Sequence, residues 1–339
     1  MILPKQTKLG FTISYDFLPP SQTHDLLEVL DNSAFTHIFV PEVWGYDAFH
    51  ECARMATQTE NLVFGTGIVN MYSRSPATMA QAAASIDEQT EGRFILGVGL
   101  SGPKVVQNWH GLDYYHGSPM QRTREYLEIL HLIFSGETVN YDTGTIFKLK
   151  NFKLRTFETP VKVPVYLAAF GTKNVQLAGE LADGWLPIWT SYPEIPSLKD
   201  NFEKGIAKRQ KIDNKDKEIA PFIVTCASED PKAKYYVQKQ LSFYIGGMGT
   251  YYARVAKQYG FTEEVDRITR AWNAGDRELA LKEVSEEMLA RLAAVGPPEK
   301  VLARYETLRK SGITNPVVWL PVGCPPALAL ETIHTFQDS

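Results

Sequence analysis

The chain has 339 residues, of which 44% are hydrophobic, and its formal net charge is -4. This length suffices for one large core or two modest domains, and the weak negative charge provides no basic field that would attract nucleic acid. No apolar run reaches the roughly 18 residues needed to span a bilayer. The amino end, MILPKQTKLGF, lacks the layout of a signal peptide. We therefore expect neither nucleic acid nor a membrane as a partner.

The cysteines are few and widely separated in the sequence. Cys52, Cys226 and Cys324 match no disulfide or zinc-binding spacing. The sequence therefore predicts a soluble cytoplasmic protein whose thiols are reduced.

Short β-like runs alternate with helix-like segments along almost the whole chain. Most of the runs are apolar at both alternating positions, as expected of strands that are covered on both faces. The predicted strands are residues 8–13, 37–42, 62–68, 93–99, 163–169, 184–189, 220–228 and 316–321.

Three of the intervening helices begin with a capping residue followed by proline. Residues 76–92 follow Ser75, residues 118–136 open with Ser118 and Pro119, and residues 230–245 open with Asp230 and Pro231. A polar N-cap followed by proline is a common helix start, and Gly92 and Gly136 are suitable C-terminal residues for the first two.

Eight strands that are each followed by a helix predict a (β/α)8 TIM barrel, with residues 1–339 as a single domain. A doubly wound sheet would need fewer strands in one layer and a clearer domain break. Two insertions are predicted. Residues 137–160 resemble a hairpin that turns at 141-YDTG-144, and residues 229–315 contain several helices, a break at 246-GGMG-249 and no strong strand.

The run 93-RFILGVGLSG-102 contains the spacing G-x-G-x-x-G at Gly97, Gly99 and Gly102. A dinucleotide fingerprint requires a helix that opens at its last glycine, whereas residues 103–111 have poor helix signals. We therefore interpret the run as the fourth barrel strand entering a loop at the carboxyl mouth, where glycines let the backbone approach a flat ligand. A simple turn is the alternative.

The stretch 64-FGTGIVNMYSRSPATMAQAAASIDEQTEGRFILGVGLSG-102 resembles the luciferase-like flavin and deazaflavin oxidoreductases. The likeness continues in 40-VPEVWGYDAF-49, 101-SGPKVVQNWHG-111, 122-RTREYLEIL-130 and 164-PVYLAAFGTKNVQLAGELADGWLP-187. Within that superfamily, E-x-W-G and S-G-P-x-V-V-x-x-W-x-G are most similar to the deazaflavin branch, whose cofactor is coenzyme F-420 (F420, an 8-hydroxy-5-deazaflavin). That branch includes methylenetetrahydromethanopterin reductases.

The resemblance implies a cofactor ring across the barrel mouth, a non-prolyl cis peptide at Gly67–Ile68 and a homodimer. Gly171, Thr172 and Lys173 lie where a strand ends and a helix begins, so that free N–H groups and the helix dipole could receive a phosphate. An ordinary capped helix with a solvated lysine is the alternative. The predicted cofactor-binding residues are Glu42, Thr66, Gly67, Ile68, Asn70, Ser101, Gly102, Ala169, Phe170, Gly171, Thr172 and Lys173.

Glu42, Trp44 and His110 are the candidate catalytic residues. The resemblance places the Glu42 carboxylate near the cofactor ring, where it could accept a hydrogen bond or relay a proton, and the alternative is a surface carboxylate beside a core tryptophan. His110 could act as an acid or base over the cofactor, since the unperturbed pKa of histidine as a residue type suits such work. Asn70, Ser101 and Asn108 could either contact the cofactor or cap loops.

Other conspicuous side chains are given less specific roles. His110 and His116 have no accompanying ligand pattern, so no metal site is predicted. Arg74 and Arg93 are expected to hold barrel loops by hydrogen bonding. Four aromatic residues could wall an apolar substrate pocket or belong to the core: Tyr244, Tyr251, Tyr252 and Trp272.

The sequence thus predicts an oxidoreductase that transfers a hydride between F420 and a small organic substrate, which it does not identify. Here the cofactor carries the chemistry and the protein supplies binding, orientation and exclusion of water. The rival hypotheses are an FMN-dependent monooxygenase of the same fold, a non-catalytic flavin-binding protein and, more remotely, a barrel with a phosphate site but no redox cofactor.

Overall fold

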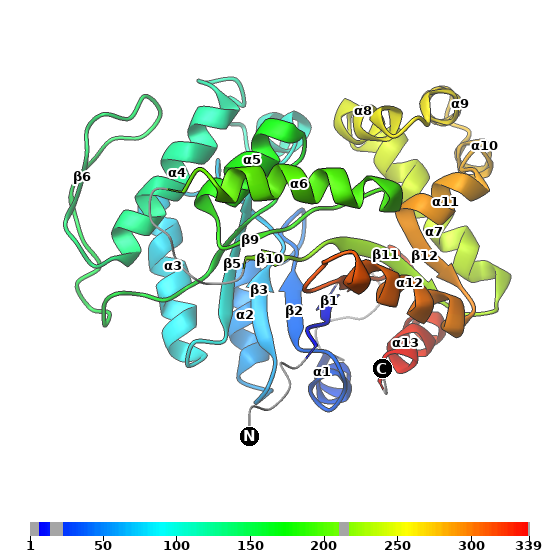
Figure 1. Cartoon of the computed structure of the whole chain (residues 1–339), viewed down its shortest axis with the longest axis horizontal. Coiled ribbons are helices and arrows are strands. Elements are labelled where there is room, and N and C mark those ends of the chain that lie inside the picture. Colours follow the sequence, from blue (N-terminus) through cyan, green and yellow to red (C-terminus); the bar gives the residue numbers. More distant parts are fainter. Residues whose placement is uncertain (1–6, 14–22, 210–216, 338–339) are drawn as a thin grey trace. The chain divides into compact units, whose positions relative to one another are not determined.

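The computed structural model describes residues 7–13, 23–209 and 217–337 (Figure 1). The chain divides into two compact units. We call residues 37–186 and 198–219 the central unit, and residues 1–36, 187–197 and 220–339 the terminal unit. The backbone passes from one unit to the other several times, and each unit contains its own run of parallel strands.

The central unit contains parallel strands in the order β10-β9-β8-β5-β3-β2, and the short strand β4 pairs with β5. Almost all of their side chains are buried, which explains why the sequence runs are apolar at both alternating positions. The strands are β2 (His37–Val40), β3 (Val63–Thr66), β4 (Val69–Asn70), β5 (Phe94–Gly99), β8 (Val165–Leu167), β9 (Gly184–Trp185) and β10 (Glu218–Ile219).

Helices follow the central strands and pack against them and against one another in chain order, as α2, α3, α4 and α5 do in Figure 1. The predicted caps are present: the Ser75 and Ser118 hydroxyls accept the backbone N–H groups of Thr78 and Gln121. The helices are α2 (Ala48–Ala56), α3 (Pro76–Gln89), a short π-helix (Val105–Trp109), α4 (Pro119–Phe134), α5 (Thr172–Leu181) and α6 (Ile195–Ile206), whose first residues belong to the terminal unit.

The insertion at residues 137–160 is the predicted hairpin. Its strands β6 (Val139–Tyr141) and β7 (Leu149–Phe152) pair in antiparallel fashion. The buried carboxylate of Glu125 on α4 accepts the backbone N–H groups of Thr145, Ile146 and Phe147 at 2.7 to 2.9 Å. The hairpin tip is therefore fixed to α4 by a charge rather than by apolar packing alone.

The described residues of the terminal unit form four parallel strands in the order β1-β13-β11-β12. They are β1 (Gly10–Thr12), β11 (Phe222–Ala227), β12 (Ala293–Gly296) and β13 (Val317–Trp319). The expectation of no strong strand within residues 229–315 is wrong, because β12 pairs with β11 over its whole length. Its sequence AAVG is short and rich in alanine, so that pairing with β11 and not β-propensity forms this strand.

Helices make up most of the remaining terminal unit. The break predicted at 246-GGMG-249 separates α7 from α8, and Asp230 caps α7 by accepting the backbone N–H of Lys232. The helices are α1 (Thr23–Asp31), a 3-10 turn (Tyr192–Glu194), α7 (Pro231–Gly247), α8 (Thr250–Gln258), α9 (Thr262–Asn273), α10 (Arg277–Lys282), α11 (Glu286–Leu292), α12 (Pro298–Lys310) and α13 (Pro326–Thr335). Within the described ranges, none of the helices is both long and apolar enough to cross a membrane.

Candidate cofactor site

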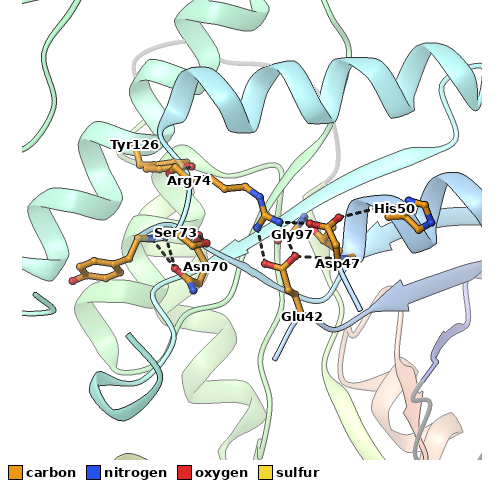
Figure 2. Close-up of polar contacts among 11 residues, drawn as sticks. Glu42, Asp47, His50, Asn70, Ser73, Arg74, Gly97 and Tyr126 are labelled. Carbon is orange, nitrogen blue, oxygen red and sulfur yellow. Dashed lines mark hydrogen bonds and ion pairs between the residues drawn. The ribbon is translucent and has the colours of Figure 1, made fainter. Parts of the chain in front are cut away.

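Arg74 joins the loops that follow β2 and β4. Its Nη1 lies 2.5 Å from Oε1 of Glu42, and its Nη2 lies 2.9 Å from Oε2 of Glu42 and 2.5 Å from Oδ2 of Asp47 (Figure 2). The hydrogen bond that Arg74 donates to Glu42 is the main cause that raises the pKa of Arg74, against the effect of burial. The expectation that Arg74 holds loops together is confirmed, and Glu42 is held in a two-pronged ion pair at the carboxyl end of β2.

Asp47 and Glu42 also fix the start of α2. The Asp47 side chain accepts the backbone N–H of His50 at 2.9 Å, and Oε2 of Glu42 accepts the backbone N–H of Ala48 at 3.2 Å. Arg93 has a similar role at the other end of the strands, where its guanidinium donates to the carbonyl oxygens of Leu62 and Thr59.

Trp44 and Trp109 are exposed and meet edge to face, with their ring centroids 5.6 Å apart. They come from the loops after β2 and β5, so the interpretation of Trp44 as a core residue is wrong. Other large apolar side chains of these two loops are also exposed: Val43, Tyr46, Leu112 and Tyr115. An exposed set of this kind is typical of a surface that binds a ligand or a partner.

His110 directly follows Trp109 and is itself exposed. It ends the π-helix, where its backbone N–H donates to the Val105 carbonyl oxygen. His116 lies farther along the same loop and is also exposed. In the ranges that the structure covers, no group of three or more histidine, cysteine and acidic side chains is placed to hold a metal ion.

Thr66 is buried and its hydroxyl replaces a regular backbone pair between β3 and β5. The hydroxyl donates to the Gly97 carbonyl oxygen at 2.7 Å and accepts the Gly97 N–H at 2.9 Å. Gly67 donates its N–H to the carbonyl oxygen of Val40, and the Gly67–Ile68 peptide bond is cis, at the position that the resemblance implies.

Asn70 is buried and its Oδ1 accepts the backbone N–H groups of Tyr72 and Ser73, at 2.8 and 2.9 Å (Figure 2). Its side-chain oxygen therefore stabilises the turn after β4. Asn70 was predicted either to contact the cofactor or to cap a loop, and these contacts support loop capping.

The glycines of 97-GVGLSG-102 have different functions in the structure. A Cβ on Gly97 would lie 1.9 Å from the Thr66 carbonyl oxygen, and one on Gly99 would lie 3.0 Å from the Ile68 side chain. These two glycines allow close packing of neighbouring strands, so their interpretation as room for a ligand is unnecessary. A Cβ on Gly102 would meet no atom within 4 Å in the described structure.

Ser101 has a left-handed backbone conformation with φ of 62°, and the π-helix follows Gly102 closely. Residues 103–111 were expected to be irregular, and this expectation is wrong for Val105–Trp109, which form the π-helix. A five-residue π-helix is nevertheless unlike the regular helix that a dinucleotide fingerprint requires, and the next α-helix begins only at Pro119.

The turn from β8 to α5 has an open helix N-terminus. Gly171 caps α5 in a left-handed conformation with φ of 69° and forms no side-chain cap hydrogen bond, while Thr172 and Lys173 are exposed. The Oδ1 atom of Asn174 in the first turn is buried and has no hydrogen-bond partner in the described structure. Ala169 is buried, and its carbonyl oxygen accepts the indole N–H of Trp185; Phe170 lies between these groups, partly buried.

Arg122 is a candidate site residue that the sequence reasoning did not single out. The residue is 8% exposed, and its guanidinium carbon lies 4.2 Å from the centroid of the Tyr72 ring. It donates to the carbonyl oxygen of His116, but its Nε has no partner, and no acidic side chain of the described residues forms an ion pair with it. A buried cation without a counterion is costly, so this position favours an anionic ligand. The sequence signal for Arg122 was its spacing. It lies four positions before Tyr126 and seven before Ile129, which places a charged residue on the apolar face of α4.

Aromatic side chains gather in the terminal unit around Trp189. The Trp189 ring contacts those of Tyr244 and Trp319, and the Tyr244 ring also contacts those of Tyr252 and Trp319, with all centroid distances between 4.9 and 5.4 Å. Trp272 packs instead against Phe243. The cavity between these rings and α8 measures only about 10 Å³. Tyr244 and Tyr252 are therefore packed together with Trp189, and as they stand they do not wall a pocket of substrate size.

Comparisons with known proteins agree with the strand order and the loop motifs. The sequence model of the family described as luciferase-like monooxygenase matches residues 6–315. The “Putative coenzyme F420-dependent oxidoreductase” of Mycobacterium tuberculosis is 30% identical over 329 residues, which cover 92% of this chain and 94% of that protein. The 5,10-methylenetetrahydromethanopterin reductase of Archaeoglobus fulgidus is 29% identical, with coverage of 94% and 96%.

Solved structures show the same fold. The coenzyme F420-dependent tetrahydromethanopterin reductase of Methanopyrus kandleri has a TM-score of 0.83 at 22% identity, with 98% of both chains covered. A type II Baeyer–Villiger monooxygenase of Pseudomonas putida in complex with FMN has a TM-score of 0.69 at 17% identity, covering 98% of this chain and 97% of that one. The predicted fold class, a TIM barrel with insertions, is confirmed, and the chain belongs to the luciferase-like family of oxidoreductases.

Proposed function

We propose that this chain is an F420-dependent oxidoreductase that transfers a hydride between the deazaflavin and a small organic substrate. The observation that carries the proposal is Arg122, a buried guanidinium without a counterion among the described residues. The chain is also 30% identical, over 92% of its length, to a protein named as a putative coenzyme F420-dependent oxidoreductase. Phosphate-bearing cofactors are anionic, and arginine is the side chain best suited to bind phosphate or carboxylate groups.

The residues present fit such a cofactor. Arg122 and the open amides at Thr172 and Lys173 would hold anionic groups, and the buried Oδ1 of Asn174 would accept a hydrogen bond from a hydroxyl. Gly102 leaves space beside Ser101. When bound, the deazaflavin supplies a ring carbon that exchanges a hydride.

The protein's own contribution is positioning and exclusion of water. Arg74 keeps the Glu42 carboxylate at the carboxyl end of β2, where it would accept a hydrogen bond from the cofactor or hold a proton. Trp44 and Trp109 would cover an apolar ligand, and His110 beside them would serve as acid or base.

Binding measurements on the purified protein test the proposal. Titration with F420 and with FMN, followed by the absorbance and fluorescence of each ring, should give the lower dissociation constant for F420. An F420-reduction assay with a panel of alcohols, aldehydes, imines and alkenes should then identify a substrate class. Tight FMN binding with oxygen-dependent turnover of NAD(P)H would replace the proposal with the monooxygenase. Binding without any turnover would favour a non-catalytic role.

Arg122→Met tests the anion site directly. We expect F420 binding to weaken at least tenfold, a loss of about 1.4 kcal/mol. Arg124→Met is a matched control on the same helix, because Arg124 forms an ion pair with Glu180 at 2.7 Å and its side chain is 36% exposed. If both variants bind F420 equally well, Arg122 does not contact the cofactor.

A homodimer in the cytoplasm completes the proposal. This assembly is inferred from the family resemblance and not from a surface of this chain. Light scattering coupled to size-exclusion chromatography would measure the mass, and a value near 38.1 kDa would mean a monomer.

A further inference from the structure

A buried amide with an unused donor lies beside the turn that follows β13. Gln240 on α7 is 2% exposed, and its Oε1 accepts the backbone N–H of Val322 at 2.6 Å. A backbone N–H can only donate, so this contact fixes which atom of the amide faces Val322. The Nε2 atom is buried and has no hydrogen-bond partner in the described structure. Gln240 therefore has N–H groups to offer next to this turn.

The turn itself, residues 321–324, uses only some of its own donors. The Cys324 N–H donates to the Pro321 carbonyl oxygen at 3.0 Å, and Gly323 at the third position has a left-handed φ of 73°. This is the pattern of a type II turn, in which glycine adopts the positive φ without strain. The N–H of Gly323 meets no acceptor among the described residues, and Gly323 is exposed. Dissolved ions can therefore reach the turn.

Lys239, the neighbour of Gln240 on α7, places a positive charge beside the same turn. A Cβ on Gly323 would lie 3.7 Å from the Nζ of Lys239. Lys239 is exposed, and its Nζ lies 5.8 Å from the centroid of the Tyr236 ring. In the part of the chain that the structure describes, no acidic side chain forms an ion pair with Lys239. Its ammonium group is therefore available to a negatively charged ligand.

The helix α13 begins directly after the turn and also starts with an unused amide. Its N-cap is Pro325, which makes no side-chain cap hydrogen bond, and Pro326 occupies the first helical position. Ala327 follows, is exposed, and has no acceptor for its N–H within the described ranges. The N-terminus of a helix favours negative charge because its free N–H groups and its dipole are positive. It therefore favours the same kind of ligand as Lys239.

The unused donor of Gln240 indicates what this ligand must provide. A buried N–H without an acceptor is unfavourable, so an acceptor oxygen at this point stabilises the site, and the ammonium of Lys239 favours a charged oxygen. We propose that the turn after β13 binds an oxyanion, the phosphate or carboxylate group of a small molecule, through Gln240 Nε2, the Gly323 N–H and Lys239. The loops that follow the last two strands of a TIM barrel often hold phosphate groups.

Titration of the full-length protein with inorganic phosphate tests the proposal. Calorimetry in chloride buffer at constant ionic strength should show binding, and the amide NMR signal of Gly323 should shift with the same dissociation constant. A second titration with acetate distinguishes a site that also accepts carboxylates from one that requires phosphate. Both titrations are repeated in Arg122→Met, which removes the other candidate anion site, and the shift of the Gly323 signal should persist there.

Variants of α7 identify the groups that hold the ion. Gln240→Glu retains the acceptor for the Val322 N–H but replaces the unused donor with a charged oxygen, so phosphate binding should weaken at least about tenfold. Lys239→Met should weaken binding about two- to fivefold, the usual range for an exposed charge pair. Lys232→Met is its matched control, because it removes an equal charge from another exposed position of α7.

Lys239→Met and the Gly323 signal decide the matter even if Gln240→Glu fails to fold. The proposal is overturned if neither anion shifts the Gly323 signal, or if Lys239→Met and Lys232→Met bind phosphate equally well. It is also overturned if phosphate binding is lost in Arg122→Met and kept in Gln240→Glu. F420 binding is measured separately, so a protein that binds phosphate here but not F420 would contradict only the proposed function.

Discussion

Gly97 and Gly102 share one sequence motif but differ in their surroundings. Gly97→Ala should destabilise the protein by about 3 kcal/mol or more, since the new Cβ would lie 1.9 Å from a backbone oxygen that cannot move aside easily. Gly102→Ala should change stability by less than about 0.5 kcal/mol, because its Cβ position is open. Urea unfolding of the two variants measures the difference. Equal stabilities would mean that β3 and β5 can separate at Thr66 without cost.

Glu42 can be separated from its partner Arg74 by kinetics. Glu42→Gln should lower kcat/KM about tenfold, or about 1.4 kcal/mol, and change the F420 dissociation constant by less than about threefold. If Glu42 acts only through its ion pair with Arg74, Arg74→Met should lower kcat/KM to the same extent. Asp47→Asn is the control, because Asp47 contacts the same guanidinium from a more exposed position. An unchanged rate in Glu42→Gln would remove the carboxylate from the mechanism.

Residues whose role depends on neighbours in sequence were predictable. Ser75, Ser118 and Asp230 cap helices as expected, because a cap needs only the next few residues. Arg122 was not, since its significance comes from side chains and backbone groups that folding brings from other segments.

At the scale of elements, the hairpin tip depends on one carboxylate. Burial raises the pKa of Glu125, but hydrogen bonds from Gln121 and from the backbone of residues 145–147 outweigh it and lower the pKa to about 2. A carboxyl with a lowered pKa stabilises the fold fully above its unfolded value near 4.5 and loses this effect as the pH falls through about 2.

The stability difference between wild type and Glu125→Gln should therefore be constant above about pH 5. Below the unfolded value it should shrink with falling pH, at most by about 1.4 kcal/mol per pH unit. Chemical unfolding of both proteins between pH 7 and pH 3 (chosen experimental limits, roughly spanning the titration) measures it. Hydrogen exchange at residues 145–147 should quicken in the variant. A difference that stays constant down to pH 3 would mean that folding does not lower the pKa of Glu125.

The elements that the sequence missed are short ones. β12 has only AAVG between two helices, and the π-helix at Val105–Trp109 has five residues, so neither contains enough periodicity to be recognised. The eight predicted strands were found because each is an apolar run bounded by turn residues, although the structure shortens all of them at one or both ends.

For the whole molecule, the alternation of strands and helices was enough to predict the fold class, and the loop motifs were enough to predict the family. The substrate was not predictable. The surface around Trp44 and Trp109, which we propose covers the ligand, is built from two loops whose joint shape no local pattern encodes.

The single-domain organisation remains a prediction, and cooperative unfolding tests it. Each compact unit is assembled from separate stretches of chain, and the backbone passes between the units near residues 36, 186, 197 and 219. Unfolding one unit would therefore pull on several covalent connections of the other. We expect peptides of the central and terminal units to lose hydrogen-exchange protection at the same urea concentration, in one transition. Fluorescence and circular dichroism should give coincident midpoints. Two separate transitions, with the central unit protected after the terminal unit has opened, would mean that the chain folds as two domains.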